Sequence, residues 1–201
     1  MTTFYLMRHG EDKDNAAGIL NGRRDEHLTM KGIQQAKTIA QKIKDSNLAI
    51  DVIYTSPLLR AVETANIVAD KLNLVKPIIL NDLVEREFGV MTGKPVNLVE
   101  KLCTPKILKI DGTVYFFEAA AAETFPQLKI RARLLLNKLS KRHSRGKILL
   151  VSHGDFGKMI YAAFYHLNWR KVLSMFYFDN GSVVELSKKA NFKKPVVFKS
   201  N

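Results

Sequence analysis

Four short apolar segments alternate with longer amphipathic segments, and this alternation limits what the chain can fold into more than any other feature. The apolar segments cover residues 3–7, 51–55, 77–80 and 147–152, and they have the length and composition of buried β-strands. Strands that alternate with helices form a largely parallel sheet with helices on both faces. We therefore expect an α/β fold, namely a three-layer α/β/α sandwich with a mostly parallel central sheet.

The segments between these strands show the period of amphipathic helices and the residues that start them. Thr29 and Thr124 stand at N-cap positions, and Gln127 gives the second helix the spacing of a capping box. Ser56 followed by Pro57 is expected to cap the helix after the second strand. The apolar stripes predict the following helix core residues: Ile33, Ala36, Ala40, Ile43, Leu58, Ala61, Val62, Ala65, Val68, Leu72, Phe125, Leu128, Ala132, Leu135, Leu139, Phe156, Met159, Ile160, Ala163, Phe164 and Leu167.

Turn signals predict two further features. Gly146 is expected to end the long helix that precedes it. Residues 175–178 and 182–186 are expected to form a closing hairpin around Asp179-Asn180-Gly181. Residues 94–123 have a mixed pattern that predicts no element.

Length and composition limit the class of protein. A chain of 201 residues with 46% hydrophobic residues can bury one substantial core, so we expect a single domain over residues 1–201. The one cysteine, Cys103, cannot form an internal disulfide, which fits a reducing compartment. The apolar runs are too short for a membrane span, and the first is a poor signal peptide. We therefore expect a cytoplasmic protein with no membrane partner.

The positive charge is unusually strong. A formal net charge of +13 allows a nucleic-acid, membrane-surface or anionic small-molecule partner. Much of the charge lies in residues 138–147 and in the C-terminal tail, where too few aromatic residues are interleaved for a base-stacking surface. We interpret these stretches as a solvated helix end and a polar tail, and we expect no nucleic-acid partner. The tail lysines are Lys188, Lys189, Lys193, Lys194 and Lys199.

The sequence does not predict the oligomeric state.

Unusual polar residues follow each of the four predicted strands. Arg8 and His9 come directly after the first strand, and Arg60 lies one helical turn beyond the second. Glu85 follows the third strand, and His153 follows the fourth. In open parallel sheets, ligands bind beyond the carboxyl ends of the strands. The four strand ends can therefore bring these residues to one pocket.

These residue types favour phosphoryl transfer over metal binding. Two arginines would repel a divalent cation, whereas the N–H donors of their planar guanidinium groups match the spacing of phosphate oxygens. A neutral imidazole at His9 can attack phosphorus and form a phosphohistidine. A main-chain carbonyl at Gly10 is expected to accept the Nδ1 proton, which leaves Nε2 of His9 unprotonated. Glu85 can protonate the leaving oxygen if its pKa is raised, and a cationic His153 can donate to the phosphoryl group.

The same residues stand in motifs that resemble those of the histidine phosphatase superfamily, in its phosphoglycerate mutase-like branch. The motifs follow the order of that family over nearly the whole chain. The resemblance implies a phosphoglycerate mutase-like fold, a small phosphorylated substrate, and no metal or other cofactor. The motifs are Arg8-His9-Gly10-Glu11, Asn15, Ile19-Leu20-Asn21-Gly22, residues 28–36, residues 56–65 with Arg60, residues 83–89 with Glu85, Gly93, and Val151-Ser152-His153-Gly154.

The resemblance implies a role for each matched residue. His9 becomes transiently phosphorylated, while Glu85 donates the proton and later activates the attacking water. Arg8, Arg60 and His153 form the phosphate pocket. Further contacts to the phosphate are implied for Asn15, Asn21, Gly22 and Gly154.

Two assignments in the loops have rivals. Glu85 competes with Asp82 and Glu87, and its spacing to the Phe-Gly pair that follows favours it. Glu123 and Thr124 resemble the family's Gly-Glu-Ser/Thr, but an alanine replaces the glycine. Their role at the substrate is left open.

Several functions fit these motifs. The first is a phosphomonoesterase that hydrolyses a small phosphorylated metabolite through a phosphohistidine on His9. The alternative is a phosphoglycerate mutase, although mutases of this family tend to be longer, with segments that shield the phosphoenzyme from water. A phosphohistidine-protein phosphatase and a non-catalytic binding protein are further alternatives, and the presence of all five site residues argues against the last. Residues 90–125 are expected to form a variable capping segment that sets the substrate.

Overall fold

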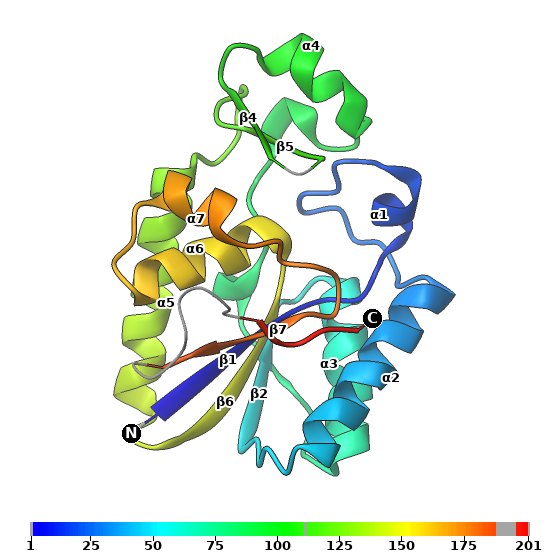
Figure 1. The fold of residues 1–201 in the computed structure, drawn as a ribbon, viewed down its shortest axis with the longest axis vertical. Coiled ribbons are helices and arrows are strands. Elements are labelled where there is room, and N and C mark those ends of the chain that lie inside the picture. The colour runs from blue at the N-terminus through cyan, green and yellow to red at the C-terminus, as the bar shows by residue number, and fades with distance from the viewer. Residues whose placement is uncertain (1, 111, 188–195, 201) are drawn as a thin grey trace.

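A mostly parallel sheet forms the middle layer of the computed structural model, which describes residues 2–110, 112–187 and 196–200 (Figure 1). Within that part of the chain the sheet is six-stranded, in the order β3-β2-β6-β1-β7-β8. Strands β1, β2, β3 and β6 pair in parallel, whereas β7 is antiparallel to both β1 and β8. The strands are β1 (Thr2–Arg8), β2 (Val52–Thr55), β3 (Ile78–Ile79), β6 (Gly146–Ser152), β7 (Val183–Leu186) and β8 (Val196–Phe198).

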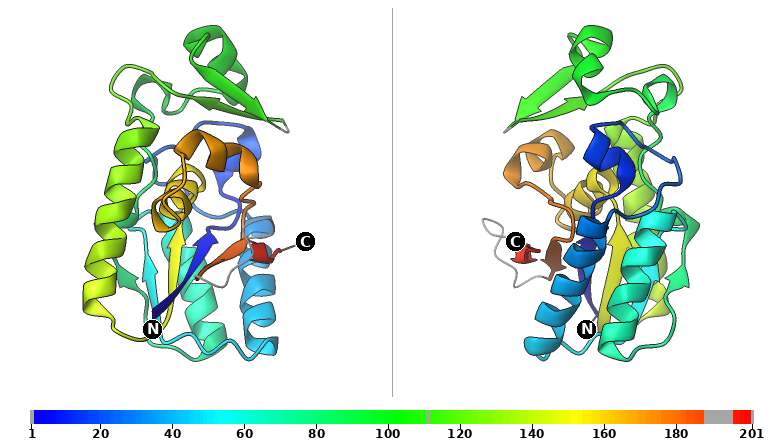
Figure 2. Two further views of the ribbon diagram at one scale, coloured as in Figure 1. Left: turned by 60° about the vertical axis from the view of Figure 1, so that its left-hand side comes forward. Right: turned by 90° about the vertical axis from the view of Figure 1, so that its right-hand side faces the viewer.

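Helices cover both faces of this sheet, as Figure 2 shows from two sides. Helices α2 (Met30–Asp45) and α3 (Leu59–Leu72) pack against each other on one face. The other face carries α5 (Phe125–Arg142) and α6 (Gly154–Phe164), with α7 (Trp169–Met175) beside them. The three-layer arrangement expected from the sequence is confirmed.

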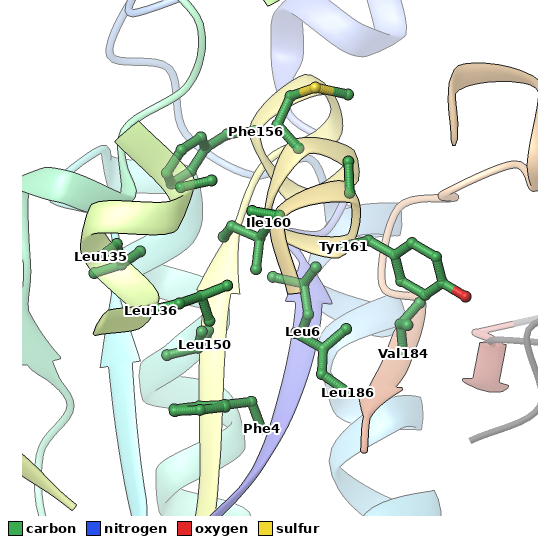
Figure 3. Packing of buried hydrophobic residues seen from close by; sticks show 14 of the residues in the cluster. Phe4, Leu6, Leu135, Leu136, Leu150, Phe156, Ile160, Tyr161, Val184 and Leu186 are labelled. Atoms are coloured by element: carbon green, nitrogen blue, oxygen red, sulfur yellow. The ribbon is translucent and has the colours of Figure 1, made fainter. Parts of the chain in front are cut away.

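Strand β1 is buried on both faces because successive side chains of a strand point to opposite sides of the sheet. Phe4 and Leu6 join the core cluster under α5 and α6, which Figure 3 shows in close view. Tyr5 and Met7 join the cluster under α2 and α3. An uninterrupted apolar run in the sequence thus serves two separate cores.

Two of the three predicted helix caps are confirmed. Thr29 accepts a hydrogen bond from the Gly32 N–H, and Thr124 forms a capping box with Gln127. The prediction for Ser56 is wrong, because α3 begins three residues later and its cap position has no side-chain hydrogen bond. The Ser56 hydroxyl accepts from the Leu58 N–H before the helix begins, and it is also hydrogen-bonded to the distant ring of His153.

Other corrections concern the segments that flank β6 and β7. Helix α5 ends at Arg142, and Gly146 begins β6 with a φ of 117° rather than ending the helix. The expected hairpin does not form, because β7 is already paired with β1 on one side and β8 on the other. Residues 196–198, which lie in the expected polar tail, form strand β8 and pair with β7. Lys188, Lys189, Lys193 and Lys194 lie outside the described residues.

Residues 96–110 and 112–116 form a small unit, here called the hairpin unit, beyond the carboxyl ends of the parallel strands, at the top of Figure 1. This unit contains the two-stranded antiparallel sheet of β4 (Ile107–Ile110) and β5 (Thr113–Phe116). A separate cluster of Phe88, Met91, Val99, Cys103 and Phe116 holds it to the loop after β3. Its use as a substrate cap and the single-domain assignment stay predictions. The remaining elements are α1 (Lys13–Ala17), α4 (Val99–Cys103) and the 3-10 turns η1 (Asn81–Leu83), η2 (Gly89–Met91) and η3 (Val96–Leu98).

None of the helices within the described residues is long and apolar enough to cross a membrane.

Adjacent leucines on α5 allow a matched test of the core. Leu135 is 1% exposed and Leu134 is 61% exposed. We expect Leu135→Ala to lower the free energy of unfolding by about 2–5 kcal/mol, because it leaves a cavity beneath the sheet. Leu134→Ala is expected to change it by less than about 0.5 kcal/mol. Urea denaturation of both variants measures the difference, and equal losses would contradict this packing.

Candidate active site

His9 lies at the carboxyl end of β1 and is only 2% exposed. Its Nδ1 is 2.6 Å from the carbonyl oxygen of Gly10, as the sequence predicts. Gly10 is needed because a Cβ there would lie 2.3 Å from the carbonyl oxygen of Gly32, at the start of α2. Close approach of two backbone segments, rather than a left-handed turn, is the reason for this glycine.

The neighbours of His9 determine which of its nitrogens carries the lone pair. Arg60 Nε donates to His9 Nε2 over 3.2 Å. An arginine can only donate, so Nε2 is the acceptor and the proton is on Nδ1, facing Gly10. Burial and the charges of Arg60 and Arg8 lower the pKa of His9 well below its ordinary value. The ring is therefore neutral near pH 7.

Arg60 is fully buried and held by four acceptors in all. Its two terminal nitrogens donate to the carbonyl oxygens of Gly22 and Arg24, each over 2.7 Å. Its Nε also lies 3.2 Å from Asp12 Oδ2, which accepts a 2.6 Å hydrogen bond from Asn21. The guanidinium thus joins α3 to the loop after β1. Asp12 was not among the predicted site residues, because nothing in a polar loop distinguishes it.

His153 lies beside His9, with ring centroids 5.1 Å apart. Its Nε2 is 2.8 Å from the Ser56 hydroxyl, while Nδ1 has no hydrogen-bond partner among the described residues. Ser56 Oγ also accepts from the Leu58 N–H over 3.3 Å, so its own proton is available for His153 Nε2. This arrangement allows the ring to carry its proton on Nδ1, from which it can donate to a ligand.

The expectation of a cationic His153 is corrected. Burial is the main cause that lowers its pKa well below the ordinary value, and the charge of Arg60 adds to it. The neutral ring can donate through Nδ1 alone.

Glu85 is buried where the loop after β3 meets the start of α6. Its Oε1 accepts from the N–H groups of Arg86 (2.7 Å) and Phe156 (3.0 Å), and Oε2 accepts from Asp155 N–H (3.2 Å). Burial, followed by the charge of Asp155, raises the pKa of Glu85. Oε2 has the longer and single hydrogen bond, so it is the better position for a proton.

A cavity of about 270 Å³ lies between these strand ends and the β4-β5 hairpin. His9, Arg60 and His153 contact one another behind its wall but do not line it, and neither does Gly22. The rivals of Glu85, Asp82 and Glu87, do not line it either. The predicted residues that line the cavity are Arg8, Asn15, Asn21, Glu85 and Gly154.

A partly buried ion pair next to Glu85 was missed by the sequence reasoning. Arg86 Nε donates to Asp155 Oδ2 over 2.8 Å. The guanidinium carbon lies 4.1–4.9 Å from the ring centroids of Phe88, Phe116 and Phe125. The pair joins the hairpin unit to the start of α6. Its partners are 69 residues apart, so no local pattern reveals it.

Asn180 and Lys158 are the other polar residues that sequence reasoning missed. Asn180 donates to the Asn15 side chain over 3.0 Å and to the His9 carbonyl over 3.1 Å. It comes from the turn that was expected to join a hairpin. Lys158 lies on an otherwise apolar stretch of α6 and lines the cavity.

Glu123 and Thr124 lie away from the cavity. Glu123 accepts two 3.0 Å hydrogen bonds from Arg131, and Thr124 caps α5. Neither residue lines the cavity, and their role at the substrate stays open.

No group of three or more His, Cys, Asp or Glu side chains in the described part of the chain is arranged to hold a metal ion. The metal-free site expected from the sequence stays a prediction.

The buried neutral histidines make the folding stability depend on pH. Below the ordinary pKa of 6.5, the unfolded chain binds protons at His9 and His153 that the folded chain does not bind. The free energy of unfolding therefore falls as the pH falls, by up to about 1.4 kcal/mol per pH unit for each histidine. We expect the double variant His9→Gln/His153→Gln to lose this part of the slope between pH 7 and 5.

Urea denaturation at several pH values measures this slope. His166→Gln, which changes an exposed histidine outside the site, provides the control and should keep the slope of the parent chain. A double variant with an unchanged slope would contradict the burial of two neutral rings.

Comparison with known proteins identifies what this arrangement is similar to. The sequence pattern of the histidine phosphatase superfamily (branch 1) matches residues 4–199. A 2,3-bisphosphoglycerate-dependent phosphoglycerate mutase of Rhizobium etli is 26% identical over 159 residues, which are 77% of this chain and 76% of the relative. Phosphoserine phosphatase 1 of Hydrogenobacter thermophilus is 29% identical over 194 residues, or 95% of this chain and 90% of the relative. The structure of Bacillus stearothermophilus YhfR matches with a TM-score of 0.78 and 28% identity, over 92% of this chain and 90% of that one.

Proposed function

This chain belongs to the histidine phosphatase superfamily, and from that premise we propose that it hydrolyses a small phosphorylated metabolite through a phosphohistidine on His9. The relatives named above are phosphatases and mutases, which are enzymes. The observation that carries the proposal is the unprotonated Nε2 of the neutral His9 ring, fixed by Gly10 and Arg60. A nucleophilic nitrogen needs this lone pair.

The reaction proceeds in two displacements at phosphorus. First, Nε2 of His9 attacks, the N–P bond forms, and the P–O bond to the alcohol breaks while Glu85 gives its proton to the leaving oxygen. Next, Glu85 takes a proton from water, the water oxygen attacks phosphorus, and the N–P electron pair returns to Nε2. The products are the alcohol and inorganic phosphate, and both side chains regain their starting protonation.

Two buried donors next to His9 support phosphate binding there. Arg8 Nε and His153 Nδ1 are buried without hydrogen-bond partners in the described residues. Such donors are costly unless a ligand satisfies them. Arg60 Nε must move from His9 Nε2 to a phosphate oxygen, and this exchange opens the nitrogen to phosphorus. Asn15, Asn21 and the backbone at Gly22 and Gly154 complete the proposed phosphate site.

A phosphoglycerate mutase is the second candidate, and the Rhizobium etli relative is the observation that favours it. Hydrolysis is favoured by the relative that covers most of this chain, which is named a phosphatase. The small cavity suits a metabolite better than a phosphorylated protein or a non-catalytic role. With 3-phosphoglycerate as substrate, a hydrolase releases phosphate, whereas a mutase forms 2-phosphoglycerate.

We also propose that the enzyme is cytoplasmic and works without a metal.

His9→Ala is expected to reduce hydrolysis of p-nitrophenyl phosphate by on the order of 1000-fold or more, because the nucleophile is lost. Labelled phosphate should be trapped on His9 of the parent enzyme by rapid quenching in alkaline detergent, because the N–P bond is stable in alkali and hydrolyses in acid. The exposed His27→Ala serves as the control and should keep its activity. Phosphate bound to another residue, or activity abolished by a chelator, would contradict the mechanism.

Glu85→Gln is expected to separate substrates by their leaving groups. Hydrolysis of an alkyl phosphate should fall about 100- to 10000-fold, because the alkoxide needs the proton of Glu85. The kcat/KM for p-nitrophenyl phosphate should fall much less, because kcat/KM covers only the steps up to the phosphoenzyme and nitrophenolate leaves without protonation. The later attack of water is common to both substrates and does not enter this comparison. Glu87→Gln, which changes a carboxylate outside the cavity, is the control.

The pH profile gives the same role a second test. Only the protonated form of Glu85 can act as the acid, so kcat/KM for the alkyl phosphate should fall as the pH rises through the raised pKa of this residue. Equal losses of kcat/KM for both substrates in Glu85→Gln would rule out this role.

A further inference from the structure

Lys158 is a buried cation on the wall of the cavity, and the proposed mechanism does not use it. It lies on α6 and is 3% exposed. Its Nζ donates to Tyr115 Oη over 2.9 Å and to the carbonyl oxygen of Leu173 over 2.7 Å. An ammonium group has three N–H donors, so these two bonds leave one N–H without an acceptor among the described residues, on a side chain that lines the cavity together with Tyr115.

Lys158 differs from the other buried cations of the site in its partners. Arg60 and Arg86 each form an ion pair, with Asp12 and Asp155 respectively. Lys158 forms none within the part of the chain that the structure describes, since both of its hydrogen-bond acceptors are neutral oxygens. A buried charge is unfavourable without a partner of opposite sign. The cavity therefore has an unmatched positive charge at this point of its wall.

The position of Lys158 places this charge away from the phosphate. Gly154 lies beside the phosphate end, because a Cβ on it would be 3.6 Å from Arg8 Cζ and 3.8 Å from Glu85 Oε2. Lys158 follows four residues later on the same helix face, which is about 6 Å along α6. The ammonium group itself is held by Tyr115 of β5 and Leu173 of α7, neither of which is among the proposed phosphate ligands, so it can contact a second group of the substrate.

We propose that Lys158 and Tyr115 form a second subsite, which selects substrates that carry a carboxylate on the alcohol portion. This inference rests on the proposed phosphatase function. Tyr115 Oη accepts from Lys158, so its own O–H is available to donate. One N–H and one O–H match the two oxygens of a carboxylate, and a single positive charge matches its single negative charge. A second phosphate would leave negative charge unmatched in a site that already holds one phosphate.

The surroundings keep both donors ready to bind an anion. Burial lowers the pKa of Lys158 to about 8, against the opposing charge of Asp155, so the amine remains largely protonated at pH 7. Its Nζ also lies 5.2 Å and 5.4 Å from the ring centroids of Tyr115 and Phe176, which stabilises the cation. Burial raises the pKa of Tyr115, so the hydroxyl keeps its proton.

Three substrates that differ only at C1 of a glycerol backbone test the subsite. Glycerol 3-phosphate has a hydroxymethyl group there, 3-phosphoglycerate has a carboxylate, and glycerol 1,3-bisphosphate has a second phosphate. Consumption of each substrate gives kcat/KM. The ratio of kcat/KM for 3-phosphoglycerate to that for glycerol 3-phosphate does not depend on the fraction of folded enzyme, so it remains valid for a destabilised variant.

We expect the parent enzyme to prefer 3-phosphoglycerate over glycerol 3-phosphate by about 10- to 100-fold, the effect of one hydrogen-bonded charge pair. Lys158→Met should bring this ratio close to one, whereas Lys158→Arg should keep most of it. Tyr115→Phe should lower the ratio by about 3- to 10-fold. The control is Lys129→Met, which removes a lysine that donates to the Leu167 carbonyl outside the cavity, and it should leave the ratio unchanged.

The outcomes separate the subsite from a purely structural role. If Lys158 only ties α6 to β5 and α7, Lys158→Met lowers kcat/KM for all substrates equally and the ratio stays the same, which overturns the proposal. A preference for glycerol 1,3-bisphosphate that Lys158→Met abolishes would overturn the assignment to a carboxylate.

Failure of the proposed function would look different, because the parent enzyme would then release phosphate from none of the three compounds. In that case, calorimetry measures the affinity of each compound for His9→Ala and for the double variant His9→Ala/Lys158→Met. The ratio of the affinities for 3-phosphoglycerate and glycerol 3-phosphate then tests the subsite in the same way.

Discussion

The buried guanidinium of Arg60 is the interaction on which the site depends. It reaches from α3 to the carbonyl oxygens of Gly22 and Arg24, to Asp12, and to the ring of His9. Burying a guanidinium charge is energetically tolerable only when hydrogen-bond acceptors surround it. The loop after β1 is therefore folded around Arg60, and the orientation of the His9 ring follows from the same requirement. The buried Arg60 therefore both orders the loop after β1 and orients the ring of His9.

The proton positions around the two histidines form one connected pattern. The Gly10 carbonyl fixes the proton of His9 on Nδ1, and Ser56 favours the proton of His153 on Nδ1. One ring thus offers a lone pair and the other offers a donor, although both are neutral and buried side by side. Identical side chains take opposite roles because their hydrogen-bond partners differ.

The features that could be predicted from sequence depend on residues close together in the chain. The alternation of strands and helices and the caps at Thr29 and Thr124 follow local rules, and the four strand ends then place Arg8, His9, Glu85 and His153 near one another. The wrong or missing features depend on distant partners. Ser56 bonds to a ring 97 residues away, Arg86 pairs with Asp155 across 69 residues, and β7 is fully paired by β1 and β8. No local pattern contains those contacts.

The ion pair of Arg86 and Asp155 has a consequence for how the hairpin unit and the acid communicate. Arg86 is the residue next to Glu85, its guanidinium also donates to the Phe116 carbonyl in β5, and Asp155 N–H donates to Glu85. Strand β5, which covers the cavity, is thus connected to the proton donor Glu85 through Arg86 and Asp155. Because these contacts follow one another, a change of sequence in the hairpin unit alters the surroundings of the proton donor as well as the wall of the cavity.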